Sequence, residues 1–412
     1  MPAVPLLASP DDLATDGARE PEGASEPSER VQLAAEPTPP LLARCVEFLL
    51  VGGGALLLFP LSWWLRRRFG TEPALLGAGF VTFYAAYAVN DPHFSVTYLL
   101  FYKDVRRRAL GPDISRAQRW RYCIAGFVVP LALLSWSALA LARHSAPALG
   151  WMIQLMFLLV GWHYSKQGFG VLMVLCARRG VKFSARERQL FLLHCYAAWA
   201  FAWANPSAAA GEFEEKGVVY WAVAHPRWLE LTTGALLLAS TLALGGLLVG
   251  KWRRERQTWP LAPLASFSIT IWSWTIYSRF DPLVQYLIPA LHSLQYFYFV
   301  WLMQSNQARA QEGPPTFGRP LRARLGMLAL CALGLGWLLF RGAPTLLDEL
   351  FVPPLRRGQV PDLLGQTPFF AAFFAALNLH HYCMDHVIWR RENPDTRFLR
   401  SATHFPALVP DS

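Results

Sequence analysis

The sequence predicts an all-α membrane protein, a polytopic transmembrane helical bundle of about ten spans. Hydrophobic residues make up 54% of the 412 positions and charged residues only 16%, whereas charged residues are about a quarter of an average soluble domain. The mean hydropathy is +0.25. The apolar residues fall in blocks of roughly 20, the length with which an α-helix crosses about 30 Å of hydrocarbon.

The ten predicted spans are 46–65, 74–102, 122–142, 149–177, 189–204, 228–250, 259–278, 283–303, 325–341 and 367–389. Every second connection is basic, namely KDVRRR, RRGVKFSARER, KWRRER, RPLRAR and RRENPDTR. Basic connections remain in the cytoplasm. We therefore expect an integral protein of the bacterial inner (cell) membrane with both termini cytoplasmic. Arg66–Arg68 and Arg356–Arg357 are exceptions, because they follow spans that would end outside.

The sequence divides into three parts. Residues 1–40 are rich in Pro, Ala and acids, a composition that predicts a disordered cytoplasmic tail. Residues 41–391 form the expected transmembrane helical domain, and 392–412 a short cytoplasmic tail. The six cysteines are single, with no C-x-x-C, so neither a disulfide framework nor a thiolate metal site is expected. The net charge is +10, and the basic residues cluster between the apolar blocks. Nucleic acid is therefore not an expected partner.

Histidines recur at a similar depth on four predicted spans. His93 lies ten residues before Lys103, His380 ten before Arg390, His292 twelve before Gln304 and His163 fifteen before Arg178. With a rise of 1.5 Å per residue, all four lie about 15–22 Å from the cytoplasmic ends of their helices. A single intramembrane histidine can hydrogen-bond a neighbouring helix. Intramembrane ionisable groups are costly and usually face the bundle interior, so four at one depth predict a shared site.

The last span leaves its ligand open, because helical spacing to Asp385 favours His381 over His380. Four residues after each of His93, His163, His292 and His381, on the same helix face, lies a polar side chain that could form a hydrogen bond with the second ring nitrogen of a metal-bound histidine. These residues are Thr97, Gln167, Tyr296 and Asp385. Further candidates are His194 on the fifth span, His386 as a substitute ligand, and the polar residues Asp91 and Lys166.

Neutral imidazole binds iron, zinc and copper. An all-nitrogen Fe(II) site with an open position, inside an aromatic bundle, suits oxygen activation on an apolar substrate, because walls that exclude water protect reactive intermediates. The expected cofactor is non-haem Fe(II), with O2 as co-substrate. The expected partners are a lipid-soluble small molecule, entering sideways from the bilayer, and membrane lipids.

Four motifs carry a resemblance to a known family: DPHFSVTY at 91–98, WHYSKQGFG at 162–170, LHSLQYFYFVW at 291–301 and HHYCMDHVIWR at 380–390. In them the chain resembles the membrane β-carotene-cleaving dioxygenases of the Brp/Blh type. The resemblance implies a helical bundle around one non-haem iron and O2-dependent cleavage of a polyene into aldehydes. It also implies His93, His163, His292 and His380 as iron ligands. Tyr296 stands where the family has a further histidine.

We expect a membrane-embedded non-haem iron oxygenase acting on a carotenoid-like or other lipid. The nearest alternative is a lipid desaturase or hydroxylase with a di-iron site, which needs about eight clustered histidines; here only HHYCMDH is clustered. A non-enzymatic alternative is a haem-binding electron carrier. Another is a transporter, with Lys166, Asp91 and Asp385 along a polar path.

Overall fold

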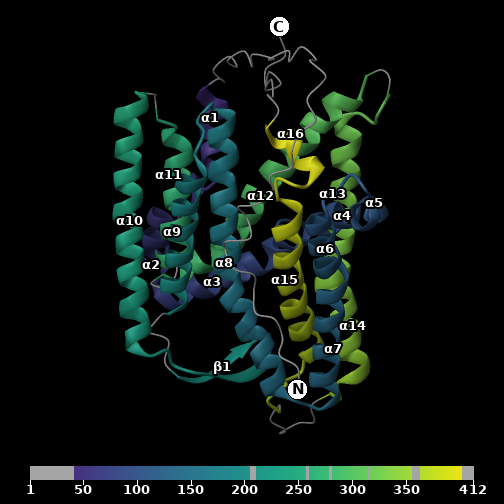
Figure 1. Cartoon of the computed structure of the whole chain (residues 1–412). Coiled ribbons are helices and arrows are strands. Elements are labelled where there is room, and N and C mark those ends of the chain that lie inside the picture. The colour runs from purple at the N-terminus through teal and green to yellow at the C-terminus, as the bar shows by residue number, and fades with distance from the viewer. Residues whose placement is uncertain are drawn as a thin grey trace, which may run out of the picture. The chain divides into compact units, whose positions relative to one another are not determined.

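The computed structural model describes residues 41–204, 210–256, 259–277, 281–313, 316–354 and 362–400. The predicted tail at 1–40 and residues 401–412 of the C-terminal tail lie outside these residues. The described residues all belong to one compact unit. As described, it is a helical bundle with one β-hairpin (Figure 1), so the predicted all-α class is confirmed.

The longer helices are α1 (Leu41–Leu50), α2 (Leu58–Phe69), α3 (Thr71–Ala85), α4 (Asn90–Tyr102), α7 (Val129–Ala142), α8 (Ala146–Arg178), α9 (Ala185–Trp203), α10 (Arg227–Glu255), α12 (Pro282–Gln311), α13 (Leu321–Trp337) and α15 (Pro368–Ile388). The shorter ones are η2 (Gly53–Leu57), α5 (Val105–Leu110), α6 (Arg116–Cys123), η3 (Ile124–Val128), α11 (Leu261–Ile269), η4 (Thr270–Ile276), η6 (Leu338–Gly342), α14 (Ala343–Phe351), η7 (Pro394–Thr396) and α16 (Arg397–Arg400). Strands β1 (Gly211–Glu215) and β2 (Val218–Ala222) pair antiparallel, with Gly211 opposite Ala222.

Four of the described helices are long and apolar enough to cross a membrane: Arg116–Ala142, Ala146–Arg178, Arg227–Glu255 and Leu321–Phe351. They coincide with four of the ten predicted spans. By length and hydropathy, fewer of the described helices qualify as membrane spans than the ten that the sequence predicts. The helices α12 and α15 carry too many polar side chains, including His, Gln, Asn and Asp, to match an ordinary apolar span.

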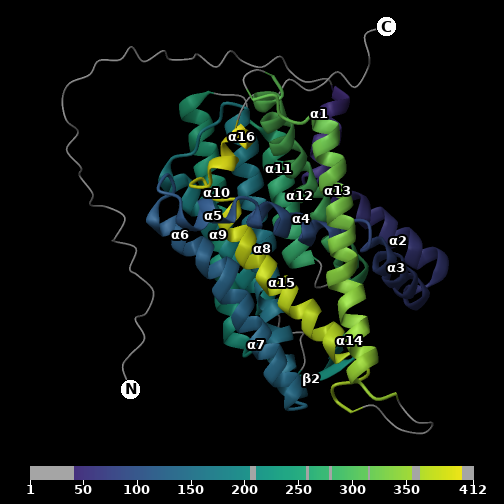
Figure 2. The same cartoon turned by 90° about the vertical axis from the view of Figure 1, so that its right-hand side faces the viewer.

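The first two predicted spans are broken. A bend of 79° separates α1 from the helix Gly53–Phe69, so this pair counts as one further span at most. The break falls at Gly52, whose φ is +142°, a conformation that only glycine adopts without strain. Figure 2 shows α2 and α3 projecting sideways from the bundle. The exceptional Arg66 is on this projection, where its guanidinium pairs with Asp281 at 2.5 Å.

A turn separates the end of α3 at Ala85 from the start of α4 at Asn90, and the first turn of α4 is buried. Helix α13 packs along α4. Gly336 makes this close approach possible, because a Cβ there would lie 2.8 Å from the Asp91 carbonyl carbon and 2.9 Å from its oxygen. The start of α4, with His93 in its first turn, is thereby held against a long apolar helix.

Local capping fixes the ends of the other helices that surround the centre of the bundle. The Ser145 hydroxyl accepts a hydrogen bond from the Ala148 amide at the start of α8 (3.3 Å). The Asp281 carboxylate accepts one from the Leu283 amide at the start of α12 (3.0 Å). Such caps satisfy amides that a helix leaves free at its N-terminus.

The α15 start is capped from another element. The buried carboxylate of Asp348 on α14 accepts hydrogen bonds from the Phe369 and Phe370 amides at 2.9 and 3.0 Å. This contact fixes the position of α15, which carries the last histidine motif.

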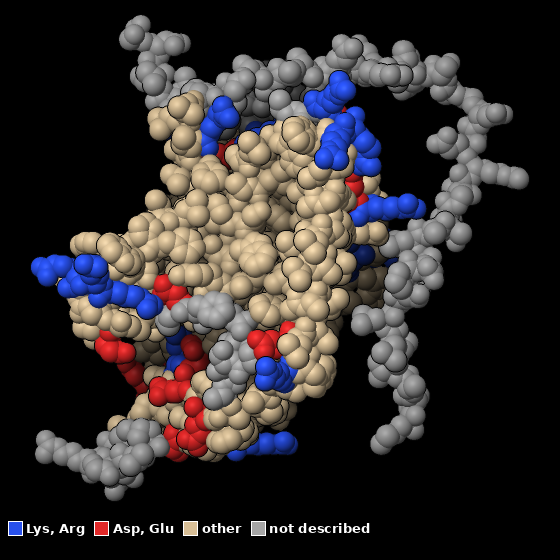
Figure 3. All heavy atoms as spheres, turned by 90° about the vertical axis from the view of Figure 1, so that its left-hand side faces the viewer, with Lys and Arg blue, Asp and Glu red and all other residues tan. Residues whose placement is uncertain are grey.

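Charged residues lie mainly at the two ends of the described bundle. Figure 3 shows a broad uncharged surface with Lys and Arg gathered above it and on the sideways projection, and Asp and Glu below. The last turn of α10 is basic, whereas β1 is the acidic segment GEFEE. Residues 394–400 of the predicted tail are folded as η7 and α16, where the Asn306 side-chain amide donates to the Phe398 carbonyl at 2.5 Å.

Candidate metal centre

Four imidazoles from four different helices meet inside the bundle. His93 comes from α4, His163 from α8, His292 from α12 and His381 from α15, helices that run through the middle of the described bundle in Figures 1 and 2. All four side chains are buried, with at most 4% of their surface exposed.

The four rings form a closed square. Going round it, the ring centroids are 4.9 Å apart for His93 and His292, 4.8 Å for His292 and His163, 4.9 Å for His163 and His381, and 4.6 Å for His381 and His93. Neighbouring rings meet edge to face, at 69–82°. The histidines that were predicted to lie at one depth on the second, fourth and eighth spans are thus in direct contact.

Asp385 completes the group one helical turn after His381. Its Oδ2 atom lies 3.4 Å from His381 Nε2 and 3.9 Å from His163 Nε2. Its Oδ1 atom is within hydrogen-bonding distance of the Thr97 hydroxyl (3.1 Å), which also lies 2.8 Å from the Tyr296 hydroxyl. The α4, α12 and α15 helices are therefore tied together next to the imidazoles.

Five polar atoms of this group are buried without a hydrogen-bonding partner among the described residues. They are His93 Nε2, His292 Nδ1, both ring nitrogens of His381, and Asp385 Oδ2. A buried polar group left without a partner costs about 1–3 kcal/mol. Native structures rarely leave such groups unexplained, and an ion is one recognised explanation. The donor set of imidazole nitrogens and a carboxylate suits a transition metal.

The spacing of these atoms also fits an ion. His93, His292 and His381 each offer a ligand atom within 4.8 Å of the others, and so do His163, His381 and Asp385. The Nε2 atoms of His163 and His292 are 3.0 Å apart. Imidazole nitrogens bind zinc at about 2.0–2.1 Å, so two of them at a right angle around one ion lie about 3 Å apart. Each of these two sets of three residues, which share His381, could therefore hold a metal ion.

His380 lies outside the group. Its Nε2 atom is 2.9 Å from the Ala125 carbonyl, so it carries the proton and donates, and its Nδ1 atom is 2.8 Å from the Tyr98 hydroxyl. Ala125 belongs to η3, a π-helix. Between the two neighbours that the sequence left open, His381 faces the other histidines and His380 binds α15 to α4 and η3.

The remaining candidate residues, like His380, lie outside the group of four imidazoles. His194 lies between α9 and α10, with its Nδ1 atom 3.1 Å from the Ser240 hydroxyl. Half-buried His386 packs against Trp162 in a tilted arrangement and has Arg390 3.4 Å from its Nε2 atom. Lys166 lies over the Tyr196 ring at 5.9 Å. None of these contacts is with the four imidazoles, and Asp91 pairs with Arg341 at 3.7 Å.

The predicted partners at four-residue spacing behave differently from expectation. Gln167 donates to the His292 backbone carbonyl at 3.2 Å rather than to the His163 ring. Tyr296 packs against His93, with ring centroids 4.4 Å apart, rather than serving His292. Contacts between helices have replaced contacts along one helix, and of the four pairs His381 and Asp385 keep their side-chain contact.

Three neighbours of the group were missed at the sequence level. The Ser293 hydroxyl lies 3.1 Å from His93 Nδ1 and donates to the Pro289 carbonyl at 2.8 Å. Phe94 packs on His381 and Tyr164 on His292, both at 4.5 Å between ring centroids. Each directly follows a motif histidine in the sequence, and that adjacency was the available signal.

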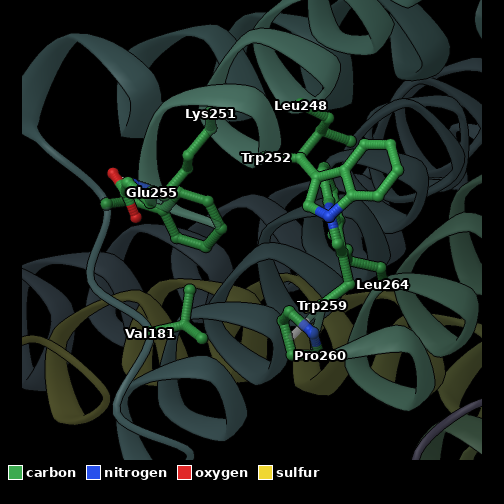
Figure 4. Close-up of a pocket in the computed structure, with 9 residues that line it drawn as sticks. Val181, Leu248, Lys251, Trp252, Glu255, Trp259, Pro260 and Leu264 are labelled. Carbon is green, nitrogen blue, oxygen red and sulfur yellow. The ribbon is translucent and has the colours of Figure 1, made fainter. Parts of the chain in front are cut away.

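A surface pocket lies away from the histidines, between the end of α10 and the start of α11. Figure 4 shows Trp252, Trp259 and Leu264 converging on it. Lys251 in its wall is held by Glu187 at 3.4 Å and Glu255 at 2.7 Å. Because this cation is already paired and no histidine of the group lines the pocket, we do not assign the metal chemistry to it.

Compared with protein-family models, curated proteins and solved structures, the chain matches none. The resemblance to the Brp/Blh-type dioxygenases therefore stays a prediction that rests on the four short motifs.

Proposed function

We propose that the protein is a membrane-embedded non-haem iron oxygenase that acts on a carotenoid-like or other lipid-soluble substrate. The observation that carries the proposal is the square of four buried imidazoles with Asp385 beside it, several of whose polar atoms have no partner among the described residues. The four membrane-length helices support its location in a bilayer. By the positive-inside rule, the basic end of α10 faces the cytoplasm.

In this proposal His93, His163, His292 and His381 hold the metal, with Asp385 as a further ligand or as the acceptor that orients His381 and His163. Iron(II) bound there would supply the binding and activation of O2. Imidazoles from four helices also fix those helices around one point, so that metal binding and the packing of the bundle reinforce each other.

The protein's own side chains define the surroundings of that point. Phe94, Tyr164 and Tyr382 pack on the imidazoles at 4.5–4.7 Å between ring centroids. They exclude water and offer apolar and aromatic surface to a lipid. Thr97 and Tyr296 hold a hydrogen-bonded proton next to Asp385 Oδ1 and thereby keep its second oxygen directed at the imidazoles.

The same geometry argues against haem. The Nε2 atoms of His163 and His292 are 3.0 Å apart and all four rings are in contact round the square, which leaves no space between them for a porphyrin. A di-iron desaturase remains the specific rival, because His381 belongs to both three-ligand groups and both of its nitrogens lack a partner.

The test is expression in cells that accumulate β-carotene, together with iron analysis of the purified protein. We expect loss of carotenoid colour and appearance of an aldehyde, which His163→Ala and His292→Ala abolish. About one iron per chain supports the dioxygenase and about two the desaturase. Unchanged colour with iron bound would redirect the proposal to another lipid. A protein without iron, whose activity His292→Ala leaves intact, would contradict it.

A further inference from the structure

A mostly buried arginine lies one aromatic layer away from the imidazoles. Arg341 is on η6, a π-helix inside the membrane-length segment Leu321–Phe351. Only 14% of its side chain is exposed. A charged residue inside a membrane helix is costly and usually marks a functional position, and π-helical turns are frequent at such positions.

Three aromatic rings enclose this guanidinium. Its central carbon lies 4.3 Å from the Phe83 ring centroid, 4.4 Å from that of Tyr87 and 5.5 Å from that of Phe370. These rings come from α3, the turn that follows it, and α15. Such cation–π contacts hold a charge in an apolar environment while leaving its N–H groups directed elsewhere.

Asp91 satisfies the arginine only in part. Its Oδ2 atom is 3.7 Å from Arg341 Nε, too far for a good hydrogen bond, and both atoms are buried without a hydrogen-bonding partner among the described residues. Asp91 is also the single acid of the described chain within 4 Å of this guanidinium. The two terminal amino groups form a fork that matches a carboxylate.

The arginine is connected to the histidines by stacked rings. Phe340, its neighbour in η6, lies 5.0 Å from Phe94, and Phe94 lies 4.5 Å from His381, both between ring centroids. An apolar chain that is anchored at Arg341 and follows these rings would bring its interior carbons to the metal group. A short acid could occupy the arginine but could not reach the metal.

We propose that Arg341 binds the carboxylate of a long-chain lipid and that the acidic head group fixes which part of the lipid reaches His381. The substrate class is thereby a long-chain carboxylic acid. As an assignment of substrate the inference rests on the proposed function, whereas the binding of the acid can be measured without it.

The experiment compares equilibrium binding of radiolabelled oleate and methyl oleate to the purified full-length protein in detergent, with iron measured on the same samples. We expect oleate to bind at least about tenfold more tightly than its ester, because hydrogen bonds between two charged groups are stronger than those to a neutral ester. Arg341→Gln should remove this preference. Asp91→Asn should strengthen oleate binding, because it removes the competing carboxylate.

The matched control is Arg68→Gln, which removes a cation that also lies over an aromatic ring, at 5.7 Å from Phe69, but on the exposed α2. It should leave the preference for oleate unchanged. Equal binding of acid and ester by the unmodified protein would overturn the inference, and so would a preference that survives Arg341→Gln. So would equally tight binding of acetate, or tighter binding of phosphatidic acid. Preferential oleate binding by a protein without iron would leave this inference standing and remove the proposed oxygenase.

Discussion

Replacing Gly336 by alanine tests how closely α13 holds the start of α4. The new Cβ would lie 2.8 and 2.9 Å from the carbonyl carbon and oxygen of Asp91 and 3.1 Å from the Pro92 nitrogen. These are backbone atoms, which cannot rotate away, so the helices must separate. Overpacking of this kind costs about 1–3 kcal/mol, whereas alanine gains up to about 1 kcal/mol over glycine in a helix interior.

Gly334 on the same helix is the matched control, because a Cβ there meets nothing within 4 Å. Both variants share the gain in helix propensity. The difference between their free energies of unfolding, measured by titration with denaturing detergent, should therefore equal the overpacking cost of about 1–3 kcal/mol. Gly336→Ala should also bind less metal, because His93 follows Asp91 by two residues. Equal stability of the two variants would refute the close packing of α13 on α4.

Three further predictions follow from single contacts. His381→Ala should lose bound metal. His380→Phe should retain the metal but lower the stability of the protein, because the contacts with Tyr98 and Ala125 are lost. Metal analysis of the two purified variants distinguishes them, and the reverse pattern would contradict the assignment. Gly52→Ala should destabilise the protein by about 1–3 kcal/mol, because its φ is +142°; unchanged denaturant unfolding would contradict the break.

The Arg107 hydrogen bond lowers the pKa of exposed Asp113. The stability that this pair contributes is therefore present above the ordinary pKa of an aspartate and is lost as the pH falls through the lowered value. We expect thermal unfolding curves of the unmodified protein and Asp113→Asn to converge in acid. A difference that grows toward low pH would contradict this pairing.

Much of the site was accessible from the sequence because depth in a membrane helix is a matter of counting. His93, His163 and His292 lie ten to fifteen residues before the cytoplasmic ends of their predicted helices, which placed them at a similar depth, and the structure brings these three rings together. Rotation about a helix axis is harder, because a change of one residue turns a side chain by about 100°. That is why His380 and His381 could not be separated by counting.

The predicted number of spans exceeded what length and hydropathy support, for a physical reason. An apolar block of 20 residues predicts one straight helix, but Gly52 allows a sharp bend in the first block, and a turn before Asn90 interrupts the second. The run of three glycines at 52–54 was the available signal. Arg341 was not foreseen, because a basic residue at the end of a predicted span is typical of an interface, and its burial depends on the packing of α3 and α15.

The central claim is that the four imidazoles bind one metal ion. X-ray absorption at the iron edge of the purified protein, combined with iron analysis per chain, tests it most directly. We predict about one iron per chain, with nitrogen and oxygen neighbours and an imidazole scattering pattern that weakens in His381→Ala and persists in His380→Phe. Iron bound through sulfur, an unchanged spectrum in His381→Ala, or no bound metal at all would contradict the account.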